Sequence, residues 1–252
     1  MLTRLPHGYA ERRLAGGVRI VARGDVLDFA TQAVQAAGSL YEYALQHEAG
    51  RLEGGRGPVP LLETPAGETW AVRHCWRGGA VAKLVRDRHL RVGNPRPLAE
   101  LEVQSVLSAR GVATPQVVAA ITYEQGAWYR GDVATVLVPE AADLAALSLT
   151  GRRWSEEERE RAWFAAGVLL RAFFATGAVH ADLNLRNIIV RRDTGQAYLL
   201  DLDRCAHGDR PRASAPPRMI ARFHRSRRKL ERLLGAQVSH RELAALKRGR
   251  GT

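Results

Sequence analysis

The stretch HADLNLRNIIVRRDTGQAYLLDLD, residues 180–203, decides the fold of this chain. It contains the pattern His-x-Asp-x-x-x-x-Asn, formed by His180, Asp182 and Asn187. Two short apolar runs joined by a turn follow, and the second run ends just before Asp201. Apolar runs of this length around a turn indicate a β-hairpin. The sequence therefore predicts three polar side chains at the ends of two neighbouring strands.

This arrangement matches what phosphoryl transfer needs. A carboxylate accepts the proton of the attacking hydroxyl, while an amide oxygen and a second carboxylate hold magnesium, which prefers hard oxygen ligands. Asp182 is the candidate base, and Asn187 and Asp201 are the candidate metal ligands. The alternative is a plain surface loop, because Asp and Asn are common turn residues. The motif, the hairpin and the second carboxylate occur together, which favours phosphoryl transfer.

Other polar residues of the stretch have secondary roles. We expect the imidazole of His180 to bind backbone near Asp201 rather than to act as the base. Arg186 lies between the candidate base and the candidate ligand, where it either screens phosphate charge or is solvated. Asp203 either assists the metal or fixes Arg204.

The motifs HADLNLRN and LLDLDR resemble those of the 3-deoxy-D-manno-octulosonic acid (Kdo) kinases, relatives of the lipopolysaccharide-core heptose kinases in the protein-kinase-like superfamily. The resemblance covers about residues 51–234. It implies a two-lobed α+β fold, with a β-rich N-lobe over residues 1–139 and a small helical C-lobe over residues 140–252. It also implies ATP and Mg²⁺ as cofactors and phosphorylation of the Kdo 4-hydroxyl on Kdo-lipid IVA. The location it implies is peripheral, on the cytoplasmic face of a Gram-negative inner membrane.

Composition agrees with a soluble globular protein that has an anionic partner. The chain has 252 residues, 46% of them hydrophobic, and a formal net charge of +12. Such a charge favours phosphates, nucleic acid or an anionic lipid surface, and with the resemblance we expect the lipid surface and no nucleic acid. Cys75 and Cys205 share no metal-ligand spacing and suit a reducing compartment. No apolar run approaches the roughly 20 residues that span a bilayer, and no signal peptide is evident.

The glycine-rich segment RLEGGRG is a candidate cover for the nucleotide phosphates. It precedes two further strand-like runs, in the order typical of a kinase-like N-lobe. Gly54, Gly55 and Gly57 would let backbone N–H groups approach phosphate oxygens closely. A plain turn explains the same glycines equally well, and only their position favours the phosphate interpretation.

A cation is expected at the end of the strand-like run over residues 69–76, in the segment AVRHCWRGG. This segment resembles a family pattern like LRHYRRGG, which places Arg73 where the heptose kinases have a lysine; Lys83 is the competing candidate. A helix expected over residues 98–109 carries the acidic partner, for which Glu100 and Glu102 are the alternatives. Alignment with the family favours Glu100.

Helices and strands elsewhere are predicted from capping and periodicity. Ser155 and Glu158 form a capping box for a helix over residues 155–176, and a basic helix covers residues 218–234. The first of these helices should bury a stripe made of Trp163, Gly167, Leu170 and Phe174. Further expectations are strands at 17–22, 128–130 and 134–138, a helix at 28–45 and a hinge at 139–142.

Seven basic residues fall within residues 218–232: Arg218, Arg222, Arg225, Arg227, Arg228, Lys229 and Arg232. Such a run is either a solvated face or a surface for anionic headgroups. The chain lacks room for a long activation segment and an Ala-Pro-Glu signature, which favours a small or glycolipid acceptor. Two rival functions stay open. His207-Gly208-Asp209 also fits an aminoglycoside- or choline-type phosphotransferase, and Arg73 in place of lysine would fit a non-enzymatic, lipid-binding pseudokinase.

Overall fold

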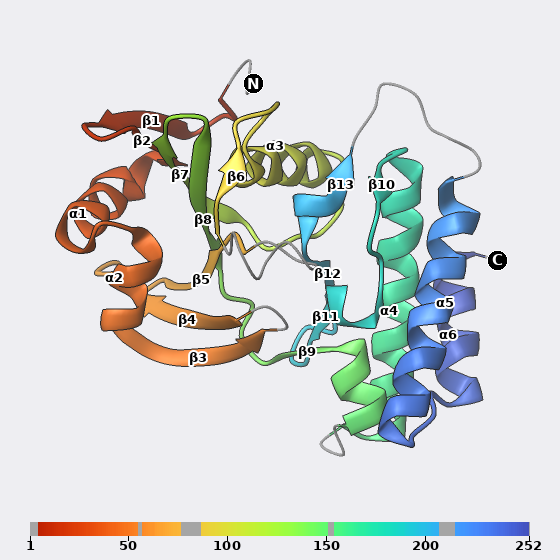
Figure 1. The fold of residues 1–252 in the computed structure, drawn as a ribbon. Coiled ribbons are helices and arrows are strands. Elements are labelled where there is room, and N and C mark those ends of the chain that lie inside the picture. Colours follow the sequence, from red (N-terminus) through yellow and green to blue (C-terminus); the bar gives the residue numbers. More distant parts are fainter. Residues whose placement is uncertain (1–4, 55–56, 77–86, 151–153, 207–214, 252) are drawn as a thin grey trace. The chain divides into compact units, whose positions relative to one another are not determined.

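We describe a computed structural model, covering residues 5–54, 57–76, 87–150, 154–206 and 215–251 (Figure 1). The chain divides into two compact units: Met1–Glu102 with Gln116–Leu137, and Val103–Pro115 with Val138–Thr252. The first unit ends at Leu137, whereas the sequence predicts that it ends at residue 139. The assignment of Val103–Pro115 to the second unit differs from the expected division, because Val103, Leu107 and Val112 are buried in that unit's core.

An antiparallel sheet forms the first unit, with strand order β1-β2-β7-β8-β5-β4-β3 and β6 paired to β8. The strands are β1 (Tyr9–Leu14), β2 (Val18–Arg23), β3 (Glu48–Gly54), β4 (Gly57–Glu63), β5 (Thr69–His74), β6 (His89–Leu90), β7 (Val117–Gln125) and β8 (Trp128–Val136). The expectation of two strands at 128–130 and 134–138 is wrong, because β8 is continuous. Gly131 and Asp132 interrupt its apolar pattern, but a Cβ at Gly131 would lie 2.5 Å from Pro97 Cγ, so close packing requires this glycine.

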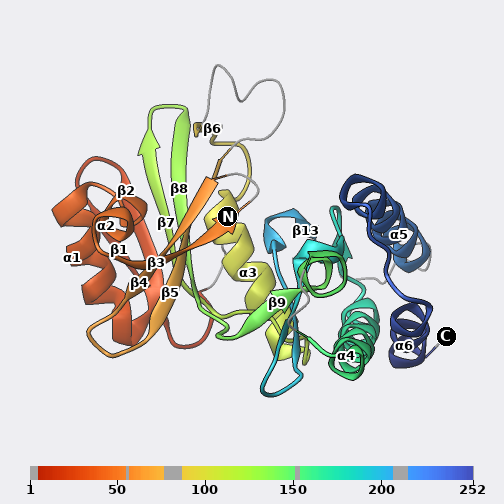
Figure 2. The ribbon, with the colours of Figure 1, turned by 90° about the horizontal axis from the view of Figure 1, so that it is seen from below.

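Helices cover both faces of this sheet (Figure 2). On one face α1 (Leu27–Ala37) and α2 (Leu40–Gln46) pack against the side that includes Ile20. On the other face, Leu98 and Leu101 of α3 (Arg96–Ala109) pack against the side that includes Val21. One continuous helix at 28–45 was expected, but Gly38 adopts φ 80° and Ser39 caps a second helix.

A buried carboxylate connects several elements of the first unit. Asp132 is 0% exposed. It accepts hydrogen bonds from the backbone N–H of Tyr41 at 3.0 Å and from the hydroxyl of Tyr123 at 2.7 Å, and its other oxygen lies 2.6 Å from His74 Nδ1. Asp132 therefore joins α2, β5, β7 and β8 through polar contacts that the sequence does not reveal.

In the second unit, α4 (Glu156–Ala175), α5 (Ala215–Leu234) and α6 (His240–Arg250) lie side by side (Figures 1 and 2). The predicted capping box of Ser155 and Glu158 is present. Phe173, rather than the expected Phe174, is fully buried. The helix α6 was not predicted. It approaches α4 through two glycines, since a Cβ on Gly167 would lie 2.3 Å from Leu246 O and one on Gly249 would lie 2.1 Å from Phe164 O.

Short strands and turns carry the polar stretch at residues 180–203. The strands are β9 (Ala141–Asp143), β10 (Val179–His180), β11 (Ile188–Arg191), β12 (Ala197–Leu199) and β13 (Cys205–Ala206), with the short helical turns η3 (Ala146–Thr150), η4 (Leu185–Asn187) and η5 (Leu202–Arg204). The predicted hairpin is the antiparallel pair β11 and β12. Two residues of the expected hinge at 139–142, Ala141 and Ala142, begin β9, which pairs with β11.

Candidate active site

His180 lies buried within the polar loop of the second unit, which is the stretch at residues 180–203. The residue is 1% exposed. Its Nε2 donates to Leu200 O at 3.1 Å, and its Nδ1 accepts from the backbone N–H of Asp182 at 3.1 Å. These two bonds specify a neutral ring, and burial lowers the pKa of His180. His180 therefore connects the segment before Asp182 to the segment before Asp201, which is the structural role expected for it.

Asp182 is held by its backbone, while its side chain stays accessible. Its carbonyl oxygen accepts from Asn184 Nδ2 at 2.8 Å and from Asn187 Nδ2 at 2.9 Å. Its side chain is 41% exposed, and Oδ1 lies 3.5 Å from Nη1 of Arg222. The backbone of Asp182 is thus fixed in position, and its carboxylate is open to an approaching hydroxyl, as a general base requires.

Asn187 and Asp201 lie at the same end of the hairpin. Ile188 pairs with Leu199, and the backbone N–H of Leu200 donates to Asn187 O at 2.8 Å. Asp201 adopts φ 59° and ψ 53°, a left-handed conformation uncommon outside glycine. Backbone geometry of this kind is found at functional sites, where surrounding contacts maintain it. The sequence prediction that strand ends bring these residues together agrees with this geometry.

The donor set at this end of the hairpin suits a hard cation. The amide nitrogen of Asn187 donates to Asp182 O, so its carbonyl oxygen is the atom that can bind a metal. Asp201 adds a carboxylate. Within the described residues no group of three or more His, Cys, Asp or Glu side chains forms a self-contained metal site. Two oxygen ligands completed by water and phosphate are typical of Mg²⁺ rather than of zinc.

The remaining candidates of the loop have peripheral positions. Arg186 is exposed, and its backbone N–H donates to Asn184 Oδ1 at 2.8 Å. Asp203 is half-buried in η5. One carboxylate that the sequence analysis did not single out is Asp143, which accepts from the backbone N–H of Ala146 at 2.8 Å; burial raises its pKa. No sequence pattern distinguishes Asp143 from a surface residue.

In the first unit the structure pairs Arg73 with Glu100. The guanidinium of Arg73, on β5, donates to Glu100 on α3, and the Glu100 side chain is only 4% exposed. Glu102, the alternative partner, instead accepts from Asn94 Nδ2 at 2.9 Å. Lys83, the competing cation, lies outside the described residues. The contact is the one predicted between a strand cation and a helix glutamate.

Two glycines of the candidate glycine loop lie at the facing ends of paired strands. Gly54 ends β3 and pairs with Gly57, which begins β4 with φ 146°. Gly55 lies outside the described residues, as do His207, Gly208 and Asp209. A Cβ at Gly57 would lie 3.1 Å from Trp76 Nε1, so this position accepts a side chain only with strain. The role of these glycines in phosphate binding stays a prediction.

Arg222 is a site residue that sequence reasoning placed elsewhere. It was grouped with the basic residues of a solvated or membrane-facing helix, yet its guanidinium lies beside Asp182. The available signal was the spacing of Arg218 and Arg222, which puts both on one face of a helix. The pattern could not tell which face points toward the polar loop.

Comparison with known proteins supplies the family. The model of the lipopolysaccharide kinase (Kdo/WaaP) family matches residues 49–249. The chain belongs to this family. The match extends beyond the expected limit at residue 234 and reaches residue 249 in α6.

Curated relatives agree with the family match. A 3-deoxy-D-manno-octulosonic acid kinase of Actinobacillus succinogenes is 35% identical over 166 residues, 62% of this chain and 67% of the relative. Proteins of the same name from Xylella fastidiosa and Xanthomonas euvesicatoria are 32% and 31% identical, covering 78% and 70% of this chain and 76% and 68% of the relatives. The chain is accordingly an ATP-dependent kinase.

Comparison with solved structures concerns the fold. A structure titled "WaaP in complex with acyl carrier protein" matches with a TM-score of 0.55 and 16% identity, covering 86% of this chain and 85% of that one. At this identity the match shows the fold alone. The expected α+β, two-lobed protein-kinase-like fold is confirmed.

Proposed function

We propose that this kinase transfers the γ-phosphoryl group of ATP to a hydroxyl of Kdo, the 4-hydroxyl by family resemblance, on Kdo-lipid IVA in lipopolysaccharide inner-core biosynthesis. The observation that carries the proposal is the polar loop around His180, which holds Asp182, Asn187 and Asp201 at one end of a hairpin. Support for the acceptor comes from relatives named as Kdo kinases that match most of the chain.

The residues of the loop then have defined tasks. Asp182 accepts the proton of the acceptor hydroxyl as that oxygen forms its bond to the γ-phosphorus and the bond from phosphorus to the β-phosphate oxygen breaks, which releases ADP. Asn187 and Asp201 hold Mg²⁺, which neutralises charge on the phosphates when bound. His180 positions both sides of the loop through its two backbone bonds.

In the first unit, Arg73 serves as the phosphate-binding cation. Its pairing with the buried Glu100 fixes the guanidinium direction, as the strand lysine and helix glutamate do in other kinases. Arg offers a planar, permanently charged donor set in place of an ammonium. Arg73 in place of lysine keeps the positive charge at this position. The pseudokinase alternative would need the loss of a catalytic group, and this change does not supply one.

The proposed location is peripheral, on the cytoplasmic face of the inner membrane. A net charge of +12 favours an anionic surface, and Arg225 and Arg228 are exposed on the basic helix α5. No helix among the described residues is both long enough and apolar enough to cross a bilayer. Arg222 is left out of the proposed membrane surface because it lies beside Asp182.

A radiolabelled ATP assay tests the function. Kdo-lipid IVA, free sugars, choline and a panel of aminoglycosides are offered separately as acceptors, with Asp182→Asn as the inactive control. Label transferred to Kdo-lipid IVA, at a position fixed by NMR of the product, supports the proposal. Efficient transfer to an aminoglycoside or choline alone would replace it with the rival phosphotransferase function, and nucleotide binding without any transfer would indicate a pseudokinase.

A further inference from the structure

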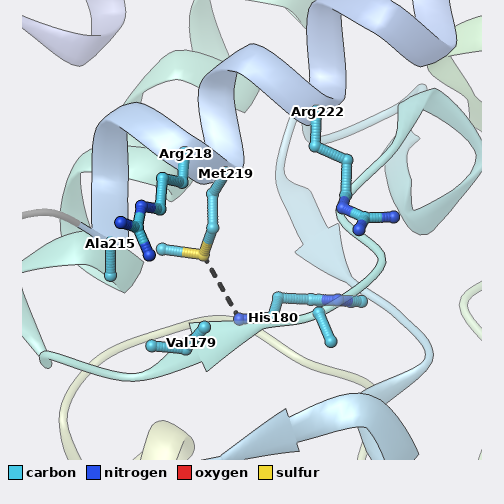
Figure 3. A pocket seen from close by; sticks show the side chains of 7 residues that line it. Val179, His180, Ala215, Arg218, Met219 and Arg222 are labelled. Atoms are coloured by element: carbon cyan, nitrogen blue, oxygen red, sulfur yellow. Dashed lines mark hydrogen bonds between the residues drawn. The ribbon is translucent and has the colours of Figure 1, made fainter.

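A cavity of about 260 Å³ lies beside the polar loop, between β10 and α5 (Figure 3). Its apolar lining comes from Val179, Ala181, Ala215 and Met219. Among the described residues, its charged lining consists of two arginines of α5, Arg218 and Arg222, and no acidic residue lines it. The cavity therefore combines an apolar floor with an excess of positive charge.

The arginines project from a helix that is anchored at this point. Met219 and Phe223 of α5 are 4% and 0% exposed, and Met219 Sδ accepts a hydrogen bond from the backbone N–H of His180 at 3.2 Å. Figure 3 shows Arg218 and Arg222 extending from α5 toward the segment with Val179 and His180. Their spacing of four residues places both on one face of the helix.

Electrostatics distinguish the two arginines. Arg222 Nη1 lies 3.5 Å from Asp182 Oδ1, so one end of the cavity adjoins the proposed base. In the described part of the chain the structure gives Arg218 no carboxylate partner. Within the described part of the chain, two guanidinium groups thus face a cavity with a single carboxylate at its edge, and an anionic ligand would balance the remaining charge.

We propose that this cavity is the subsite for the carboxylate of the acceptor sugar. The inference rests on the proposed function and assigns its acceptor specificity to Arg218 and Arg222. The planar guanidinium donates two parallel hydrogen bonds to a carboxylate, a geometry that fixes orientation as well as charge. A 3-deoxy sugar acid also presents a methylene group, which suits the apolar floor around Met219.

The test compares two soluble acceptors of nearly equal size. The methyl glycoside of Kdo carries the carboxylate, and its carboxamide lacks the charge. The ratio of kcat/KM for the acid to kcat/KM for the carboxamide is measured for the wild type, Arg218→Gln, Arg222→Gln and Arg222→Lys. Arg241→Gln, which removes an equal charge from an exposed site on α6, is the matched control.

We expect the wild type to prefer the acid by about 10- to 100-fold, the range of a charged hydrogen-bonded pair. Arg222→Gln should bring this ratio close to one and Arg218→Gln should lower it, while Arg222→Lys keeps part of it and Arg241→Gln keeps all of it. Any effect of Arg222 on Asp182 alters both acceptors alike and cancels in the ratio.

The outcomes separate the subsite from the function. If the wild type phosphorylates the glycoside and both Gln variants keep the wild-type ratio, the subsite is wrong and the proposed function stands. If those variants lose turnover only on Kdo-lipid IVA, the arginines bind a lipid phosphate, which overturns the carboxylate assignment. If the wild type phosphorylates no Kdo acceptor at all, the proposed function fails and the subsite fails with it.

Discussion

The two units of this kinase use their charged side chains in opposite ways. In the first unit Glu100 and Asp132 are buried and bind other protein groups through their carboxylates. In the loop of the second unit, Asp182 is held by its backbone carbonyl, and its carboxylate is 41% exposed. The first arrangement fixes structure, whereas the second leaves reactive atoms available.

This difference separates carboxylates that support the fold from the one that we propose acts on substrate. Burial alone does not mark a functional residue, because Asp132 is more buried than Asp182 and has a structural role. The more informative feature is which atoms the protein already uses. Where protein hydrogen bonds hold the backbone of a residue but leave its carboxylate oxygens accessible, a substrate or a cation can bind to those oxygens.

The largest effect should come from Asp182→Asn. The amide keeps the size of the side chain but cannot accept the proton, so kcat should fall by roughly 10²–10⁴ while the affinity for ATP changes little. Steady-state kinetics with a nucleotide-binding titration measure both quantities. Asp193→Asn, at an exposed turn carboxylate of the same hairpin, is the control. Equal turnover of the two variants would remove Asp182 as the base.

Asp132→Ala tests the structural side of the comparison. It leaves the N–H of Tyr41, the hydroxyl of Tyr123 and the ring of His74 without their partner in the core. The free energy of unfolding should fall by about 3 kcal/mol. Asp28→Ala removes a carboxylate that is 81% exposed and paired to Arg12, and should cost less than about 1 kcal/mol.

Urea unfolding of both variants provides the measurement. A stability of Asp132→Ala equal to that of Asp28→Ala would show that the buried network contributes no net stability. The claim that the buried carboxylates of the first unit support the fold would then be wrong.

Asn187→Ala and Asp201→Ala test the metal site. Each should weaken binding of Mg·ATP by roughly tenfold or more, and added magnesium should restore part of it. Titration of a fluorescent nucleotide at several magnesium concentrations checks this. Asn184→Ala is the matched control, because it also removes an amide bond to Asp182 O. If Asn184→Ala shows the same magnesium dependence, the effect comes from loosening the loop and not from losing a ligand.

Sequence reasoning succeeded where local patterns specify structure. The hairpin after Asn187 and the capping box at Ser155 follow from turn chemistry and helix caps. The pairing of Arg73 with Glu100 was expected from the family resemblance and the order of the strands. These signals act over a few residues or over a recognisable succession of strands, so they can be recognised without knowledge of the tertiary structure.

It failed where long-range packing decides. The capping box of Ser239 and Glu242 is a local signal for the helix α6, but the packing of α6 on α4 depends on the close approach of Gly167 to Gly249, which no local pattern encodes. Likewise, Arg222 belongs to a basic run, and only the tertiary structure puts its side chain beside Asp182. Contacts between segments far apart in sequence determined both outcomes.

The smallest effect per residue concerns the exposed arginines of α5. Arg225 and Arg228 are exposed, and each should contribute about 1 kcal/mol to binding of an anionic surface at physiological salt, screened within a Debye length of roughly 8 Å. Replacing both by Gln should therefore weaken binding to vesicles that contain anionic lipid by roughly tenfold or more. Co-sedimentation over a range of salt concentrations measures this, with Arg241→Gln as the control for loss of charge. The difference from wild type should shrink as salt rises, because screening removes the attraction that the variant lacks. If the double variant binds as the wild type does at every ionic strength, Arg225 and Arg228 are only solvated and have no role in binding an anionic surface.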